Sequence, residues 1–309
     1  MPRIPTTEQR VDALTALSDR LYPAVDQIID GETRARRTLR LGIRVVAHTL
    51  EETFGVSTAS NTWHGFLVQE LDTAGISVND PEYGLFPQYR NRARKLPTDI
   101  IIPPVNRKLD MRANTYADVR RATWAQDGTL ETDASHVLHL AGLALPYAAE
   151  YYPHLDLRKV AIYVLIHDFL EAYVGDVASF GLSDAENEEK MAREMAAFPE
   201  FEKEFGSNYP KLVKLVHDYE HLVDDEAKYV KTFDKLDPGF THAANGGHQL
   251  KAKYNIQSQQ EHLEKASLTT RRMASYNSSF PLVMEDREEM MHRIGEAAWP
   301  DTTPARQIK

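Results

Sequence analysis

Two adjacent residues, His167 and Asp168, follow the apolar run at residues 164–166, in a segment whose periodicity predicts a buried helix. A polar group buried there without a partner costs several kcal/mol, roughly 2–7 for each group. Glu171 comes four residues after His167 and three after Asp168, so a helix would place all three side chains on one face. A divalent cation is the simplest partner that makes this arrangement favourable.

Two more residues complete a possible ligand set. His136 falls in the first turn of one expected helix, and Asp234 falls in the last turn of a later one. Together with His167 and Asp168 they give the order His … His-Asp … Asp. Two neutral imidazoles and two carboxylates suit one divalent ion that keeps open positions for water and substrate, and the set tolerates Mn, Co, Mg, Zn or Fe. His139, on the same face as His136, competes with it for the first position, although the preceding residues 131–135 favour His136.

The order of these residues resembles that of the HD-domain superfamily of metal-dependent phosphohydrolases, which is named for its His-Asp doublet. Residues 166–176 are similar to the doublet segment of the 5′-deoxynucleotidase branch, which has Glu three and Asp eight positions after the doublet Asp. Residues 187–194 resemble the intervening helix of that branch, and residues 218–235 resemble its approach to the last ligand. The resemblance spans about residues 116–254 and implies an all-α fold.

The resemblance also implies catalytic roles for two carboxylates. It assigns proton transfer to Glu171 and the orientation of the attacking water or the leaving oxygen to Asp176. The metal would lower the pKa of a bound water and polarise a phosphoryl oxygen. A partly desolvated carboxylate beside a cation can act as an acid or a base, which agrees with these assignments.

Several residues are candidates for substrate binding. The Arg-Ala-Thr-Trp run containing Arg121 and Trp124 is similar to an Arg/Trp element that lies by the substrate phosphate and sugar in the family. Arg120 is an alternative to Arg121, whose planar fork would suit bidentate contact with a phosphate dianion. Lys231 and Lys235, one helical turn apart, would add positive potential.

The resemblance implies a hydrolase of nucleotide phosphate esters that converts a deoxynucleoside 5′-monophosphate to a deoxynucleoside and phosphate. A deoxynucleoside triphosphate triphosphohydrolase is an alternative, in which the basic run at residues 90–95 would meet a longer phosphate tail; otherwise that run is a surface charge cluster. A non-catalytic nucleotide-sensing module is an alternative from another class. Glu171 and Asp176 argue against it, because a sensor needs no water activation.

Two other metal enzymes deserve comparison. The segment from His217 to His221 fits the H-x-x-E-H pattern of inverted zinc proteases. A distant third carboxylate would be needed, and nothing in the sequence nominates one. HD-domain oxygenases share the doublet but need further histidines before the last aspartate, and His217 and His221 fit that position poorly.

Helical periodicity dominates the chain and predicts an all-α architecture. Residues 1–115 form a helical extension with a Pro-rich connection, 116–254 the HD-domain core, and 255–309 C-terminal helices packed on that core. Prolines predict a long, partly extended connection at 77–110, after which helices resume near residue 116. Helices are expected from about residue 7, with Thr7 as a candidate cap, and at 34–54, 135–150, 157–173, 184–198, 209–221, 225–236, 257–276 and 284–298.

Composition limits the possible partners. The formal net charge of −10 argues against a nucleic-acid partner. The absence of cysteine excludes disulfides and Cys-ligated zinc. No apolar leader is evident and no stretch approaches the ~20 apolar residues of a membrane span, so the sequence predicts a cytoplasmic protein that acts on a small nucleotide. A homodimer stays open, because related enzymes often form dimers.

Overall fold

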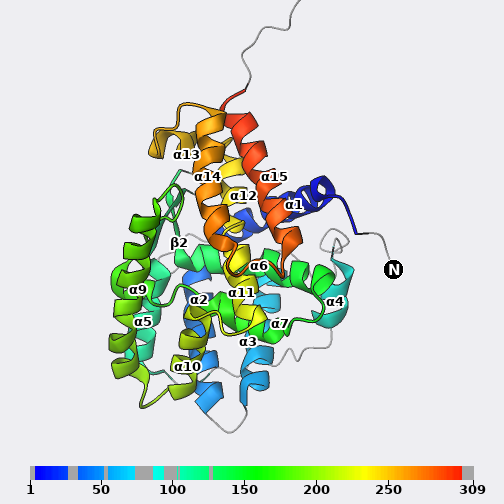
Figure 1. Cartoon of the computed structure of the whole chain (residues 1–309). Helices are drawn as coiled ribbons and strands as arrows, with labels where there is room; N and C mark the ends of the chain where they lie inside the picture. The colour runs from blue at the N-terminus through cyan, green and yellow to red at the C-terminus, as the bar shows by residue number, and fades with distance from the viewer. Residues whose placement is uncertain are drawn as a thin grey trace, which may run out of the picture.

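The computed structural model describes residues 4–26, 34–51, 55–73, 86–93, 103, 105–124 and 128–300. This part of the chain is almost entirely helical, which confirms the all-α prediction (Figure 1). None of the described helices combines the length and apolar character needed to cross a bilayer. The helices are α1 Thr7–Asp26, α2 Arg34–Glu51, α3 Gly55–Thr73, α4 Pro87–Ala93, α5 Arg107–Asp118, α6 Asp133–Tyr151, α7 Leu157–Ile166, α8 Glu171–Val174, α9 Asp184–Phe205, α10 Pro210–Glu220, α11 Asp225–Asp234, α12 Asp237–Ala244, α13 His248–Lys253, α14 Gln259–Met273 and α15 Pro281–Ala298; the strands are β1 Arg120–Trp124 and β2 Leu130–Thr132.

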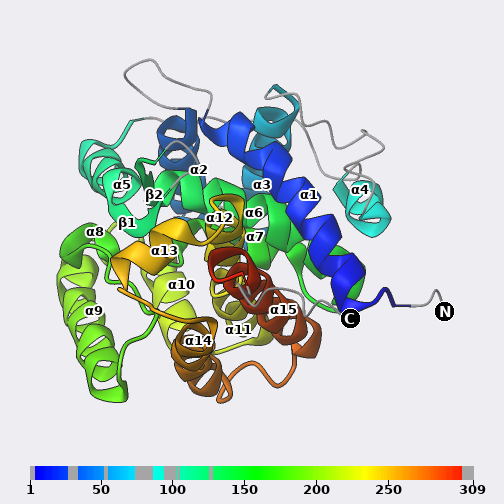
Figure 2. The same cartoon turned by 90° about the horizontal axis from the view of Figure 1, so that it is seen from above.

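Helix α6 is the central element of the fold (Figures 1 and 2). Its sequence is apolar on nearly every side, and it packs against helices from both ends of the chain, including α1, α2, α7 and α11. Thr132 caps the helix, since its Oγ1 accepts a hydrogen bond from the Ser135 backbone N–H at 3.2 Å. This cap fixes where the helix begins and places His136 in its first turn, as predicted.

The helix predicted at 157–173 is interrupted. Helix α7 ends at Ile166, and tight turns carry the chain to α8, with the Glu171 N–H donating to the Asp168 carbonyl at 2.9 Å. The ring Nδ1–H of His167 donates to the Val164 carbonyl at 2.8 Å, using an acceptor that a continuing helix needs for its own backbone. The prediction of one continuous helix is therefore wrong, although the doublet and Glu171 still lie close together.

The prediction for 77–110 is also wrong where the structure describes it. Helix α4 begins with Pro87, a position where the missing N–H costs nothing. Helix α5 begins at Arg107 after Asn106, whose Oδ1 accepts from the Leu109 N–H at 3.3 Å. Residues 77–85, 94–102 and 104 lie outside the described residues. Helices α3, α12 and α13 have no counterpart among the predicted helices.

A two-stranded antiparallel sheet stands where helix was expected after residue 116. Helix α5 ends at Asp118, and in β1 the side chains alternate, with Arg120 exposed and Arg121 buried. Because a strand has a period of two, only one of the adjacent arginines can face the interior. The alternation decides in favour of Arg121.

The first and last helices pack against each other (Figure 2). The Arg10 guanidinium of α1 lies 2.7 Å from the Asp286 carboxylate of α15, which also accepts from the buried Tyr147 hydroxyl of α6 at 2.5 Å. Thr6, rather than the expected Thr7, caps α1 by accepting from the Gln9 N–H at 3.3 Å. One apolar core includes residues of all three predicted segments, whose boundaries stay a prediction.

A buried histidine joins α3 to α4. His64 is fully buried, and its Nε2 lies 3.0 Å from the Tyr89 hydroxyl. Burial disfavours the charged imidazolium and lowers the pKa of His64 to about 4.

This histidine predicts a pH-dependent stability. An unfolded histidine titrates near 6.5, so between about pH 6.5 and 4 the unfolded chain binds a proton that the folded chain does not, and stability falls as the pH falls. In His64→Leu, the slope of unfolding free energy against pH in this window should decrease by up to about 1.4 kcal/mol per pH unit. Urea titrations at several pH values measure it. The exposed His154→Leu substitution is the control, and equal slopes in wild type and His64→Leu would contradict the assignment.

Candidate metal centre

Four side chains from three helical segments converge, and we call them the four-residue cluster: His136, His167, Asp168 and Asp234. One ligand atom from each lies within 4.8 Å of all the others. The Nε2 atoms of His136 and His167 are 3.1 Å apart, and His136 Nε2 lies 3.0 Å from Asp234 Oδ1. His167 Nε2 lies 3.0 Å from Asp168 Oδ2. The structure thus brings together the four residues that the sequence nominated as ligands.

The donor chemistry of the cluster fits a divalent ion. His167 Nδ1–H donates to a backbone carbonyl and His136 Nδ1–H donates to Asp237 at 2.9 Å, so each neutral ring turns the lone pair of its Nε2 toward the cluster. Two lone pairs and two carboxylates facing one point repel one another unless a cation or a proton lies between them. Burial alone would lower the pKa of His136, but its bonds to Asp234 and Asp237 outweigh burial and raise the pKa to about 10.

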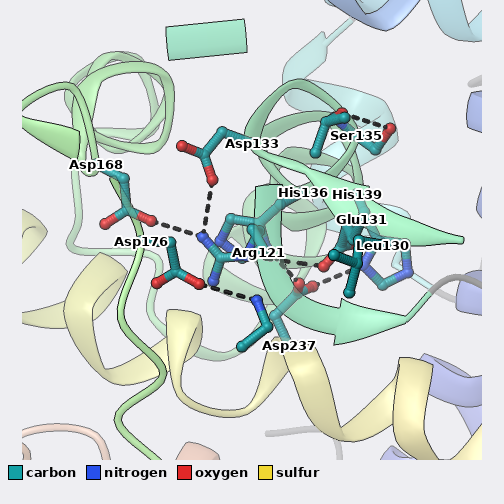
Figure 3. A network of polar contacts seen from close by, with 12 residues as sticks. Arg121, Leu130, Glu131, Asp133, Ser135, His136, His139, Asp168, Asp176 and Asp237 are labelled. Carbon is teal, nitrogen blue, oxygen red and sulfur yellow. Dashed lines mark hydrogen bonds and ion pairs between the residues drawn. The ribbon is translucent and has the colours of Figure 1, made fainter. Parts of the chain in front are cut away.

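A chain of hydrogen bonds supports His136 from behind (Figure 3). Asp237, at the start of α12, accepts from His136 through Oδ2 and from His139 Nδ1 through Oδ1 at 2.7 Å. The Ser18 hydroxyl of α1 donates to His139 Nε2 at 3.0 Å. His139, the competing ligand, therefore contacts Asp237 and lies outside the four-residue cluster. Burial would raise the pKa of Asp237, but the two histidines hold it well below its usual value.

Arg121 points into the carboxylates (Figure 3). Its guanidinium lies 2.8 Å from Asp168, 3.2 Å from Asp133, 3.7 Å from Glu131 and 3.8 Å from Asp234. Burial would lower the pKa of Arg121, but Asp168 and Asp133 outweigh it and keep the group charged. Glu131 and Asp133 had no predicted role. Their position before a capped helix was visible in the sequence, but not their contact with Arg121.

Glu171, at the start of α8, is a buried carboxyl group with a free oxygen. Only 5% of the residue is exposed, and its Oε2 makes no hydrogen bond in the part of the chain that the structure describes. Burial raises the pKa of Glu171 well above its usual value, and the nearby charges of Asp168, Asp133 and Asp176 raise it further. Such a carboxyl group takes up a proton readily.

A cavity of about 100 Å³ opens beside the cluster, and we call it the inner cavity. Its acidic wall contains Asp168, Glu171, Asp176 and Asp234 with Arg121, and its basic wall contains Lys190, Lys231, Lys235 and Arg287. Asp176 follows Gly175, whose φ of 71° favours glycine, and its Oδ2 accepts from the Ala122 N–H of β1 at 2.9 Å. This turn brings Asp176 to the cavity.

A larger chamber of about 500 Å³, the outer chamber, shares part of this lining. Both are lined by Ser179, Lys190, Glu194, Lys231, Lys235 and Thr269. The remaining wall of the outer chamber is partly apolar, with Met191, Met195, Leu222, Met273 and Tyr276. The inner cavity can hold a phosphoryl-sized group, whereas the outer chamber has the size typical of organic ligand sites.

Of the predicted substrate-binding residues, some line the cavities and others do not. Lys231 and Lys235 line both cavities, and the Lys235 ammonium lies 2.5 Å from Asp234. Trp124 is not among the residues lining either cavity; the Lys253 ammonium lies 5.1 Å from the centre of its ring. Arg90 and Arg92, the described arginines of the basic run, line neither cavity.

His217 and His221 form a separate surface pair. Their rings stack with centroids 4.0 Å apart, and both residues are exposed. Within the described ranges they join no group of three potential ligands. Neither the protease pattern nor a second iron site gains a third ligand here.

Comparison with known families shows to which family the chain belongs. Residues 115–275, about half of it, match the family model described as HD domain. The chain belongs to the HD-domain family. Searches of curated proteins and of solved structures gave no match. Family membership and the four-residue cluster make the chain a metal-dependent hydrolase with a divalent metal ion as its cofactor, as predicted.

The hydrogen-bonded chain behind His136 predicts an effect on metal affinity. Asp237→Asn should weaken binding of Mn²⁺ by about 10- to 100-fold, because the carboxylate orients the ring and sets its tautomer. Ser18→Ala should act in the same direction more weakly. Competition with a chelating dye measures both. Thr15→Ala on α1 is the control, since among the described residues that hydroxyl bonds only to the Val11 carbonyl of its own helix. Wild-type affinity in Asp237→Asn would refute the support role.

Proposed function

We propose that this protein is a nucleotide phosphohydrolase that converts a deoxynucleoside 5′-monophosphate to a deoxynucleoside and inorganic phosphate. The observation that carries the proposal is the unbonded Oε2 of buried Glu171, which lines a cavity beside the four-residue cluster. Hydrolysis of a phosphate ester needs a proton acceptor next to the site where water attacks. The resemblance of residues 166–176 to the 5′-deoxynucleotidase branch supports this choice of substrate.

The chain's residues divide the work of the reaction. The bound metal ion supplies Lewis-acid polarisation of the phosphoryl group and lowers the pKa of a water. Oε2 of Glu171 takes the proton of the attacking water and returns it to the leaving 5′-oxygen. Asp176, fixed by the Ala122 N–H, orients that water or the leaving oxygen.

Arg121 contributes through the acidic wall. Because its guanidinium contacts Asp168, Asp133 and Asp234, it holds both ligand carboxylates, Asp168 and Asp234, in place and offsets part of their charge. Contact with the phosphate, the role suggested for Arg121 by resemblance, would require some of these ion pairs to open. Positive charge from Lys231 is available to the phosphate without such a change, whereas the Lys235 ammonium already contacts Asp234.

The two cavities suggest how the substrate lies. The phosphoryl group occupies the inner cavity, and the nucleoside extends into the partly apolar outer chamber, where Tyr276 and methionines can contact a base. Trp124 remains a candidate for sugar contact only if its ring leaves Lys253.

The first test of the proposed function is product analysis. The protein should release inorganic phosphate from deoxynucleoside monophosphates with manganese, cobalt or magnesium, and should lose this activity with chelator or in Asp168→Ala. Chromatography of reactions with mono-, di- and triphosphates distinguishes the alternatives. Release of intact triphosphate would instead indicate a triphosphohydrolase. No turnover of any nucleotide, with metal bound, would contradict hydrolysis and favour a sensing module.

The role of Glu171 makes a separate prediction. Glu171→Gln keeps the shape of the side chain but removes its proton acceptor, so kcat should fall by about two to four orders of magnitude while metal affinity stays within a few-fold. Kinetics and metal titration measure the two effects. Glu202→Gln, on the exposed face of α9, is the matched control. Undiminished kcat in Glu171→Gln would exclude this residue as the base.

A further inference from the structure

A buried arginine on α15 has no acidic partner in the part of the chain that the structure describes. Arg287 of α15 is only 3% exposed. Its Nε donates to the Lys235 carbonyl at 3.2 Å, one terminal nitrogen donates to Thr270 Oγ1 at 2.5 Å, and the other donates to the Ala266 carbonyl at 3.4 Å. Among the described residues no carboxylate lies within ion-pair distance of it. Buried charges are normally paired, so this one calls for a counterion.

Arg287 lines the inner cavity. It contacts the backbone carbonyl of Lys235, the residue that follows the ligand Asp234. Lys231 lines the same wall and likewise forms no ion pair in the described structure; its ammonium lies 5.5 Å from the centre of the Tyr219 ring. Lys235 is engaged by Asp234 and Lys190 by Glu194 at 3.3 Å. Arg287 and Lys231 are therefore the two cations of this wall that form no ion pair among the described residues.

Arg121, the arginine on the acidic wall, is already paired with carboxylates of that wall. Arg121 is surrounded by carboxylates, and so it cannot offer its charge to a ligand without losing ion pairs. The guanidinium of Arg287 has five N–H donors and the three bonds above use three of them. Two donors and an uncompensated charge therefore remain for an anion in the inner cavity.

We propose that Arg287, with Lys231, forms an anion subsite that receives the phosphoryl group of the substrate. The proposal rests on the proposed phosphohydrolase function and names a specificity residue for it. Arg287 lies beyond residues 115–275, the segment that matches the family, so α15 supplies this charge from outside the matched domain. A phosphate dianion meets the size of the inner cavity and the charge of its basic wall.

Calorimetric titration of inorganic phosphate into the manganese-loaded protein tests the subsite without any turnover. Arg287→Met should raise the Kd for phosphate about tenfold or more, as loss of a charge-assisted hydrogen bond does, and Arg287→Lys should retain part of the affinity. Arg293→Met is the matched control, because Arg293 lies on the same helix but pairs with Asp12 and Glu289 at the surface. A wild-type Kd in folded Arg287→Met would overturn the proposal.

Arg287 also joins α15 to α14, so circular dichroism and thermal unfolding accompany each titration. If Arg287→Met does not fold, Arg287→Gln keeps one donor for the Lys235 carbonyl and gives the same comparison. If neither folds, Lys231→Met decides, with a weakened Kd supporting the subsite and an unchanged one overturning it. Phosphate binding that depends on Arg287 without nucleotide hydrolysis would leave the subsite standing and remove the proposed function; hydrolysis with unchanged phosphate binding would do the reverse.

Discussion

The candidate metal centre depends on how the negative charge of its clustered carboxylates is neutralised. The guanidinium of Arg121 lies within 4 Å of carboxylates from four residues, Glu131, Asp133, Asp168 and Asp234. Arg121 and the Lys235 ammonium on Asp234 supply two positive charges for four carboxylates, so further neutralisation has to come from protons or from a metal ion. The raised pKa values of Asp133, to about 7, and of Glu171 are the proton part of that compensation. A divalent cation held by the four-residue cluster would supply the remainder.

Packed helices hold these charged side chains in place. Helix α6 is apolar along most of its length and buried. Its capped first turn presents His136 to the cluster. The apolar α7 ends at the doublet, and α11 ends at Asp234. In α11 the residues that pack inward beside Asp234, Tyr229, Val230 and Phe233, are buried. The same packing that stabilises the helices therefore fixes the ligands, which favours a rigid metal site.

Sequence reasoning succeeds where the signal is local and fails where it is not. The order of His and Asp residues along the chain nominates the four ligands, and the spacing after the doublet nominates Glu171. The structure gathers the four ligands and places Glu171 beside Asp168. The break before α8 depends on a ring-to-backbone bond of His167, and β1, where the sequence predicts helix, forms by pairing with β2. Ser18, Asp237 and Arg287 carry no motif. Their importance arises from contacts between segments far apart in the chain, such as the one between Ser18 and His139.

These long-range contacts change how the two extensions should be understood. Helix α1 reaches the metal centre through Ser18 and the bonded chain to His136, while α15 reaches the inner cavity through Arg287. The two helices are tied to each other by the ion pairs of Arg10 with Asp286 and of Arg293 with Asp12. A movement of either helix would therefore shift the other helix and the residues that line the site. Both segments outside the matched residues 115–275 therefore contribute residues around the candidate site: Ser18 bonds to His139 behind the metal centre, and Arg287 lines the inner cavity.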